Sequence, residues 1–484
     1  MPKFKDYLYF LPWAIVYFIT RLINLIRLPV FADEAIYIRW SQVIKAVETL
    51  RFIPLTDGKQ PLFMWLTVPF FKVFSDPLFA SRFVSVLAGF VTLTTLYTIC
   101  VYLNTSRFAK ISVCLIYISS TFTFFFDRMA LADNLLTTLA SLSLLLTILQ
   151  IKHLRLDLSL INGGILGLAW LTKSPAIFFI TLSIVTVLLF HRTLKSLILG
   201  MITFFISFSI YNILRLGPQF HMIALRNQDY VWSVTEILHH PFDPLKPHLL
   251  DIVNLFSSYL PIGILLLSLI LIIFKITKHY QYKHDLQWIS LFLAWSLLPL
   301  LANAAFAKVF TARYILYTIS PLILAVTFAI NNYQKKLIIL IVFLSLFPTV
   351  IQNYHLMTDP FTVQLPPTET GYNQDWTSGW GIQSASKYLI ARSHQANVIV
   401  GTEGYFGTLP DGLQIYTNNI PRLTVFGIGV QIDAIPPKLL DAKAHGDEVY
   451  LLVNSNRITI PKSFLNIIHQ YPKPDKTQLL LIRI

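Results

Sequence analysis

The 484-residue chain is 55% hydrophobic and only 13% charged, and its mean hydropathy is +0.61. Soluble globular domains carry about 25% charged residues, so the composition excludes an ordinary soluble protein and indicates a membrane protein. The formal net charge of +14 does not indicate nucleic-acid binding, because Lys and Arg are scattered singly between apolar runs. Cys100 and Cys114 lie within apolar runs, so we expect neither a disulfide framework nor a thiolate metal site.

The apolar runs predict a mainly α, polytopic membrane protein with about eleven spans, since a helix needs roughly 20 apolar residues to cross a bilayer. The expected spans are residues 8–28, 79–103, 108–126, 133–151, 159–172, 175–190, 196–216, 252–274, 287–303, 314–331 and 335–353. The first run contains no A-x-A cleavage site, so we expect it to be an uncleaved span. Residues 61–75 are apolar but too few to cross, which favours a surface or re-entrant helix.

The short loops alternate in charge, which predicts their orientation by the positive-inside rule. One set of loops is basic and holds Lys3, Lys5, Arg107, Lys110, Lys152, Arg155, Arg192, Lys195, Lys275, Lys278, Lys283, Lys335 and Lys336. We therefore expect the N-terminus to be cytoplasmic, the C-terminal region to be extracytoplasmic, and the protein to lie in the cytoplasmic (plasma) membrane.

The chain divides by composition into a membrane module over residues 1–353, a linker over 354–369 and a small soluble α/β domain over 370–484. In the last segment we expect a helix over 382–393 and strands near 397–401 and 448–453. In the membrane module, the first external loop, residues 30–60, contains apolar residues at helical spacing. That helix would lie either in the lipid interface or against the helical bundle.

Acidic and basic side chains gather on the expected external side. Asp33 and Glu34 follow the first span, Lys59 precedes an apolar helix, and Arg82 lies near the outer end of the second span, where a charge is costly. Each has a simpler explanation: a solvated turn for the acids and snorkelling for the arginine.

Further external turns add more charges. Arg128 and Asp133 stand at a helix entry, where Asp133 could instead cap the helix. Lys173 separates two short spans, and Lys308, Arg313 and Tyr314 stand at the mouth of a later one. Isolated cations beside carboxylates suit a ligand that carries phosphate, and a carboxylate can deprotonate a hydroxyl as a general base.

The order of these motifs resembles a known family. The motifs are Asp33-Glu34, the Lys-x-Pro-Leu-x-x-Trp run from Lys59 to Trp65, Arg82, the Arg-x-x-x-x-Asp turn from Arg128 to Asp133, Leu-Thr-Lys-Ser from Leu171 to Ser174, and Arg313-Tyr314. Together, over about residues 5–350, they are similar to the GT-C membrane glycosyltransferases of the protein mannosyltransferase and aminoarabinose transferase type.

The resemblance implies a GT-C fold, a polyprenyl-phosphate sugar donor and transfer with inversion to an extracytoplasmic protein, lipid or glycan. Asp33 would then be the general base, and Glu34 and Asp133 would orient substrate or loop. The donor phosphate would be held by cations from the set Lys59, Arg128, Lys173, Lys308 and Arg313; Arg82 and Tyr314 are further candidates for substrate contact.

Metal binding is not expected. Some relatives use a Glu before Lys-Pro at a metal, whereas here that position is Gly58, with Gln60 inserted before Pro61. A divalent cation therefore stays a disfavoured alternative, and no other cofactor is expected. His239, His240, Asp243 and His248 fit an extended, proline-rich loop better than a metal cluster.

Two other classes of protein fit this sequence less well than a transferase. A transporter or flippase of lipid-linked sugars commonly shows two similar halves with broken helices, and this sequence shows no such symmetry. A non-catalytic membrane scaffold leaves the charges on one side unexplained. Nucleic acid is not an expected partner; lipid, donor and external acceptor are.

Overall fold

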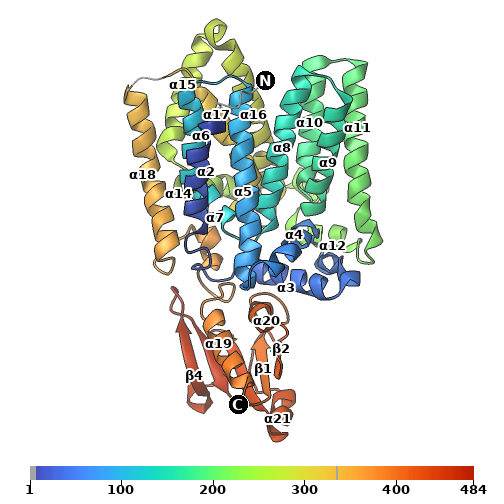
Figure 1. The fold of residues 1–484 in the computed structure, drawn as a ribbon, viewed down its shortest axis with the longest axis vertical. Helices are drawn as coiled ribbons and strands as arrows, with labels where there is room; N and C mark the ends of the chain where they lie inside the picture. The colour runs from blue at the N-terminus through green and yellow to red at the C-terminus, as the bar shows by residue number, and fades with distance from the viewer. Residues whose placement is uncertain (1–6, 334–335) are drawn as a thin grey trace. The chain divides into compact units, whose positions relative to one another are not determined.

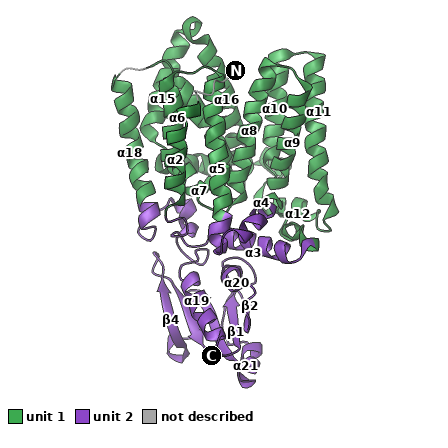
Figure 2. Ribbon diagram, in the orientation of Figure 1, with its two compact units in different colours: residues 1–23, 49–63, 82–354 green, residues 24–48, 64–81, 355–484 purple. Residues whose placement is uncertain are grey.

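The computed structural model describes residues 7–333 and 336–484. Lys3, Lys5 and Lys335, three of the residues used to predict orientation, lie outside the described residues. The chain forms two compact units (Figure 2). Unit 1 comprises residues 1–23, 49–63 and 82–354, and unit 2 comprises residues 24–48, 64–81 and 355–484. Each unit is therefore assembled from three separate stretches of the chain.

Unit 1 is made of helices that lie side by side (Figure 1). The helices of the expected spans are α2 (Leu11–Leu22), α5 (Pro77–Tyr102), α6 (Arg107–Ser119), α7 (Thr121–Asp127), α8 (Ala132–Lys152), α9 (Leu156–Thr172), α10 (Ala176–His191), α11 (Leu194–Tyr211), α14 (Leu245–Tyr259), α15 (Ile262–Thr277), α16 (His279–Phe306), α17 (Ile319–Ile330) and α18 (Lys336–Thr358). Other elements of unit 1 are the 3₁₀ helices η2 (Ile53–Asp57), η4 (Asn212–Leu216) and η5 (Ala312–Thr318), with α12 (Met222–Tyr230) and α13 (Val234–His239); α4 (Leu62–Thr67) begins in unit 1 and continues into unit 2.

The helices are those of a multi-pass membrane protein. Among the described residues, six helices are long and apolar enough to cross a membrane, and up to eight if each bent pair counts as one span. The count of eleven stays a prediction, because α2, α9 and α10 are apolar but shorter. The run 61–75, expected to be too short to cross, forms α4 and the 3₁₀ helix η3 (Val68–Lys72).

Two expected spans are not continuous helices. Residues 252–274 were expected to form one helix, but α14 ends at Tyr259, α15 begins at Ile262, and the two are bent by 111°. Pro261 stands at this break and cannot supply the amide that a continuous helix requires. Residues 108–126 are likewise split into α6 and α7, which are bent by 59° on either side of Ser120.

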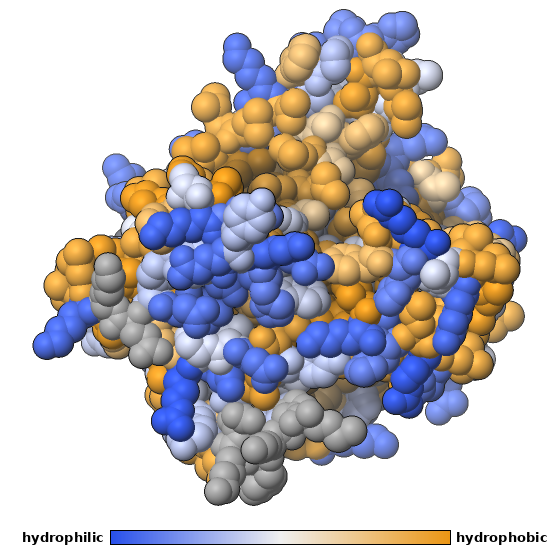
Figure 3. All heavy atoms as spheres, turned by 90° about the horizontal axis from the view of Figure 1, so that it is seen from above, coloured by the Kyte–Doolittle hydropathy of each residue, from blue (hydrophilic) through white to orange (hydrophobic). Residues whose placement is uncertain are grey.

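The outer surface of the helices is suited to lipid. Helix α18 is only 28% buried over its apolar window, whereas η5 and α17 are 83% buried. Leu344 and Phe347 of α18 are accordingly exposed, as expected where hydrocarbon replaces water as the solvent. Seen from above, hydrophilic side chains gather on one end face among hydrophobic ones (Figure 3).

Unit 2 contains a five-stranded sheet with the order β2-β1-β3-β5-β4. The strands are β1 (Val398–Glu403), β2 (Leu423–Gly429), β3 (Glu448–Asn454), β4 (Asn466–Pro472) and β5 (Gln478–Arg483). Strand β1 is parallel to β2 and β3, while β5 is antiparallel to β3 and β4. The helices are α3 (Ala32–Ala46), α19 (Ile382–Ser393), α20 (Asp411–Thr417) and α21 (Pro437–Ala444), with short 3₁₀ turns η6 (Pro367–Tyr372) and η7 (Lys462–Phe464); η1 (Glu48–Leu50) begins at the last residue of the α3 stretch and continues into unit 1. The expected small C-terminal α/β fold is therefore confirmed.

Both faces of the sheet are covered, as the alternation of side chains along a strand requires. Tyr450 and Leu452 of β3 join a core that includes residues of α3, α19 and α20. Leu451 and Val453 point to the opposite face, where a second, smaller core contains Ile432.

Helix α3 belongs to this α/β core. Its residues Ala35 and Ile38 are fully buried in the same cluster as Leu413 of α20 and Leu389 of α19. We expected α3 to pack against lipid or the helical bundle, but the sequence pattern records only that one face is apolar, not which surface covers it.

Candidate active site

The Asp33-Glu34 pair lies in the first turn of α3. Glu34 is fully buried, and its Oε2 accepts a hydrogen bond from the backbone N–H of Phe31 at 3.0 Å. This contact satisfies an amide at the helix start, and acids in a first turn also interact favourably with the helix dipole. The next residue, Ala32, donates its N–H to the Thr377 carbonyl at 3.0 Å. Glu34 therefore fixes the turn that carries Asp33, which is itself partly exposed.

A group of six side chains in unit 1, which we call the Tyr314 cluster, brings together predicted residues from four distant parts of the chain. Its members are Lys59, Asp133, Lys173, Tyr230, Arg313 and Tyr314. Lys173 Nζ lies 2.5 Å from Asp133 Oδ1 and 4.3 Å from the centre of the Tyr314 ring. The Arg313 guanidinium lies 4.9 Å from the same ring, and its Nη2 donates to the Tyr314 hydroxyl at 3.2 Å.

Lys59 reaches the cluster through Tyr230, at the end of α12. Its Nζ lies 3.4 Å from the Tyr230 hydroxyl and 4.8 Å from the ring centre, and the rings of Tyr230 and Tyr314 meet edge to face. Next to Lys59, Gln60 donates its Nε2 to Ser174 Oγ at 2.8 Å, which ties this loop to the turn that carries Lys173. The hydrogen bond between Gln60 and Ser174 therefore holds together the two segments that carry Lys59 and Lys173.

The charges of the cluster favour an anion. Burial lowers the pKa of Lys173, Asp133 opposes that shift, and the positive charges of Arg313 and Lys59 lower the pKa further. The cluster holds three cations and one carboxylate, a net charge of 3 − 1 = +2. The Asp133 side chain is buried, whereas the Lys173 side chain is 21% exposed. Asp133 therefore holds the Lys173 ammonium at the solvent-accessible edge of the cluster.

Lys308 contacts this cluster only through its backbone. Its N–H donates to the Tyr230 carbonyl at 2.8 Å. Its ammonium instead donates to the Gln228 carbonyl at 2.8 Å and lies 4.6 Å from the Trp232 ring centre. There it lines a separate cavity of about 500 Å³.

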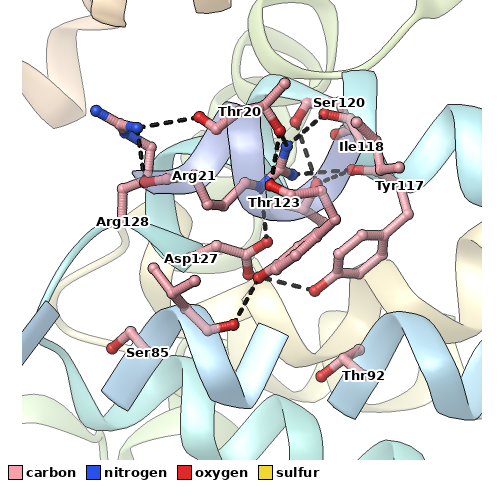
Figure 4. A network of polar contacts seen from close by, with 12 residues as sticks. Thr20, Arg21, Ser85, Thr92, Tyr117, Ile118, Ser120, Thr123, Asp127 and Arg128 are labelled. Atoms are coloured by element: carbon pink, nitrogen blue, oxygen red, sulfur yellow. Dashed lines mark hydrogen bonds and ion pairs between the residues drawn. The ribbon is translucent and has the colours of Figure 1, made fainter. Parts of the chain in front are cut away.

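Arg128 caps a helix rather than joining the cluster. Its Nη1 donates to the carbonyls of Thr20 and Arg21 at 3.0 and 2.8 Å (Figure 4). The same atom donates to the Ile23 carbonyl at 2.9 Å. These groups lie at the C-terminal end of α2, where carbonyls need donors and a cation is favourable. Arg82 is fully buried in α5 and close enough to repel Arg128. Donor-phosphate binding by Arg128, and substrate contact by Arg82, stay predictions.

A buried ion pair beside this cap was missed by the sequence analysis. Arg21 Nε lies 3.3 Å from Asp127 Oδ2, and the Tyr117 hydroxyl donates to Asp127 Oδ1 at 3.2 Å (Figure 4). Gly89 leaves room for the pair, because a Cβ there would lie 2.3 Å from Asp127 Oδ1. The sequence did indicate this pair indirectly, because Arg21 lies inside the first apolar run. A charged residue within a membrane span usually has an oppositely charged partner or belongs to a functional site.

Gly58, which stands where some relatives have a metal-binding glutamate, is also constrained by its backbone conformation and its neighbours. Gly58 has a φ of +65°, and a Cβ there would lie 2.7 Å from the Met222 carbonyl oxygen. A glutamate at this position would therefore strain the backbone and require the facing segment to shift. Within residues 7–333 and 336–484, no group of three His, Cys, Asp or Glu side chains is arranged to hold a metal ion. His248 Nδ1 instead lies 2.8 Å from the Ala304 carbonyl.

Residues 58–212 match the family model described as dolichyl-phosphate-mannose-protein mannosyltransferase. This segment contains Lys59, Arg82, Arg128, Asp133 and Lys173 of the motifs given above. Among curated proteins, none matches the chain.

The fold is similar to that of ArnT from Cupriavidus metallidurans. The crystal structure of that protein bound to undecaprenyl phosphate aligns with a TM-score of 0.59 at 12% identity, over 98% of this chain and 97% of that chain. The structure of the same protein in the apo state aligns with a TM-score of 0.56 at 12% identity over the same shares. These comparisons confirm the resemblance: the chain has the fold of GT-C membrane glycosyltransferases of the protein mannosyltransferase and aminoarabinose transferase type.

Proposed function

We propose that the protein transfers a sugar from a polyprenyl-phosphate donor to an extracytoplasmic acceptor, a protein, a lipid or a glycan. The observation that carries this proposal is the Tyr314 cluster, in which three cations from separate elements lie beside two tyrosines and one of the cations, Lys173, is paired with a carboxylate. The family match over residues 58–212 and the ArnT-like fold support the same reaction class.

The cluster is suited to the donor phosphate. Lys173, Arg313 and Lys59 present an excess of positive charge at a partly exposed edge, and charge-assisted hydrogen bonds to phosphate are stronger than neutral ones. As the sugar leaves, negative charge grows on the phosphate oxygen. Preorganised cations stabilise that charge most in a site of low dielectric.

Asp133 acts on the cation that it holds. Its carboxylate keeps the Lys173 ammonium in one position, so the charge is in place before the donor binds. Such preorganisation avoids reorganising the site during the reaction. Asp133 is therefore assigned a positioning role and not a role in proton transfer.

Asp33 is proposed as the general base. It takes the proton from the acceptor hydroxyl while the acceptor oxygen forms a bond to the anomeric carbon of the donor. The bond between that carbon and the phosphate oxygen breaks, and polyprenyl phosphate leaves with its electron pair. Attack opposite to the leaving group inverts the anomeric configuration. Neither proton transfer nor stabilisation by the cluster requires a metal or another cofactor.

The test uses purified full-length protein in lipid with radiolabelled polyprenyl-phosphate mannose, glucose and aminoarabinose and a cell-envelope acceptor fraction. Release of polyprenyl phosphate by wild type, its loss in Asp33→Asn and the opposite anomeric configuration in the product are the expected results. Equal release by Asp33→Asn removes Asp33 from the mechanism. Label that crosses the membrane with its phosphate bond intact supports a flippase instead.

A further inference from the structure

Two cavities in unit 2 lie outside the site described above. The first has a volume of about 560 Å³ and the second about 540 Å³. Both are bordered by Gln383 of α19 and Tyr416 of α20, so they meet at these two side chains. Each volume lies in the range of about 300–1,000 Å³ that holds small-molecule ligands.

The linings combine amide groups with aromatic rings. The first cavity presents Asn418 and Asn419 beside Phe71 and Phe74, while the buried Gln42 at its wall donates to the Ile415 carbonyl at 2.8 Å. The second presents Asn24 beside Phe361 and Trp380. An amide side chain both donates and accepts hydrogen bonds, which matches a sugar hydroxyl, and an aromatic face matches the C–H face of a pyranose ring.

The aromatic wall of the second cavity is held in place. Trp380 Nε1 donates to the carbonyl and to the Oδ1 of Asn373, both at 3.0 Å, and Phe361 packs against its ring at a centroid distance of 5.4 Å. A ring fixed in this way loses little conformational entropy when a ligand stacks on it.

The charges of the linings argue against a strongly anionic ligand. Lys45 and Lys387 stand with Asp76 in the first cavity, and Arg27 stands with Asp359 in the second. The first cavity therefore holds two cations and one carboxylate and the second holds one of each, whereas the Tyr314 cluster holds three cations and one carboxylate. A nucleotide or phospholipid headgroup would face a carboxylate in either cavity, whereas a hydroxyl-rich, weakly charged ligand is not repelled.

The cavities also adjoin the helix that carries Asp33. The second is lined by residues up to Val30, just before α3, and the first by Gln42, Lys45 and Ala46 at the other end of α3.

We propose that these two cavities form one binding site for a saccharide chain of more than one ring. The binding claim stands without the transferase reaction; the assignment of the bound saccharide as acceptor rests on the proposed function.

The experiment measures binding of fluorophore-labelled oligosaccharides of two and four hexose or N-acetylhexosamine rings to the full-length protein in lipid nanodiscs. Wild type is expected to bind at least one series saturably, with the four-ring chain bound more tightly. Gln383→Ala is expected to weaken binding about tenfold, the loss expected for one hydrogen bond to a ligand. The matched control is Gln470→Ala, an exposed glutamine of β4 away from both cavities.

A second variant separates loss of the site from loss of the fold. Ser384 is exposed and lines only the second of the two cavities, so Ser384→Trp fills it without entering the core. This variant is expected to abolish the advantage of four rings over two while keeping the two-ring chain bound.

Two results overturn the proposal: no saturable binding of any probe to wild type, or unchanged binding in both Gln383→Ala and Ser384→Trp. Lys173→Ala in the same assay keeps saccharide binding. A chain that binds the probes but lacks transferase activity in every assay contradicts the proposed function alone.

Discussion

The Asp133 carboxylate holds the Lys173 ammonium at 2.5 Å, with the Tyr314 ring 4.3 Å from the same nitrogen. The two charged residues come from the start of α8 and the turn between α9 and α10, 40 positions apart in the chain. This pair gives the Tyr314 cluster a fixed cation at an accessible edge, and the first prediction concerns that cation.

Replacing Lys173 by alanine removes a charge that stabilises the departing phosphate. We expect kcat for transfer to fall by about 10²–10³, the loss typical of removing one preorganised donor. Asp133→Asn, which keeps the shape but not the charge, is expected to have a smaller effect. Lys195→Ala, at an exposed lysine in the first turn of α11, is the control. Activity of Lys173→Ala equal to that of Lys195→Ala would contradict the assignment.

The second prediction concerns Gly58, where a side chain would cause both backbone strain and a steric clash. Gly58→Ala introduces a Cβ that strains a positive φ and lies 2.7 Å from the Met222 carbonyl oxygen. We expect a loss of about 1–3 kcal/mol in the free energy of unfolding from the backbone strain and a further loss from the clash. Gly446 also has a positive φ, +89°, but a Cβ there meets nothing within 4 Å. Gly446→Ala therefore measures the strain alone, and an equal loss in both variants would exclude the clash.

Much of this arrangement could be predicted from the sequence. Apolar runs and isolated charges revealed the helical membrane module and most members of the Tyr314 cluster, because charges in such a chain are rare and costly. Helix 382–393 was predicted with its exact ends, and strands β1 and β3 within a few residues, whereas β5 was not predicted as a strand. Strands β2 and β4 were missed, since their residues alternate weakly between buried and exposed positions.

Other features depend on contacts that sequence patterns do not record. Tyr230 joins Lys59 to the cluster, but an aromatic residue at a helix end is too common to single out. The sequence surroundings of Arg128 suggested phosphate binding, which stays a prediction, but they did not indicate that its Nη1 donates to three carbonyls at the end of α2. The apolar face of α3 was visible, but not the α/β core that covers it.

The third prediction concerns the buried pair Arg21–Asp127. Breaking it with Arg21→Met leaves an uncompensated buried carboxylate, and we expect a loss of about 3–5 kcal/mol in stability. The double variant Arg21→Met/Asp127→Leu is expected to lose less than Arg21→Met alone, because both charges are removed together. Thermal unfolding in lipid, followed by tryptophan fluorescence, measures these losses.

An exposed pair supplies the control for that comparison. Arg155 and Asp157 lie 2.6 Å apart, but their side chains are 66% and 52% exposed. Breaking this pair with Arg155→Met is expected to cost about 0–1 kcal/mol. An equal loss at both pairs would show that burial of the Arg21–Asp127 pair does not determine its contribution.

The last prediction is a pH dependence set by Asp411, which begins α20. Burial raises the pKa of Asp411 from 3.8 to about 6, although the Gly407 N–H and Arg39 both oppose the shift. Since the folded state then binds a proton that the unfolded state has released, Asp411 contributes stability below pH 3.8. This contribution is lost as the pH rises to about 6. Its full size is up to about 3 kcal/mol, from roughly two pKa units.

We expect Asp411→Asn, which can still accept from the Gly407 N–H, to reduce the change in melting temperature between pH 4 and 6. Asp433→Asn, at an exposed carboxylate, is the control and should leave the wild-type dependence of melting temperature on pH unchanged. If Asp411→Asn also keeps the wild-type dependence, other groups cause it.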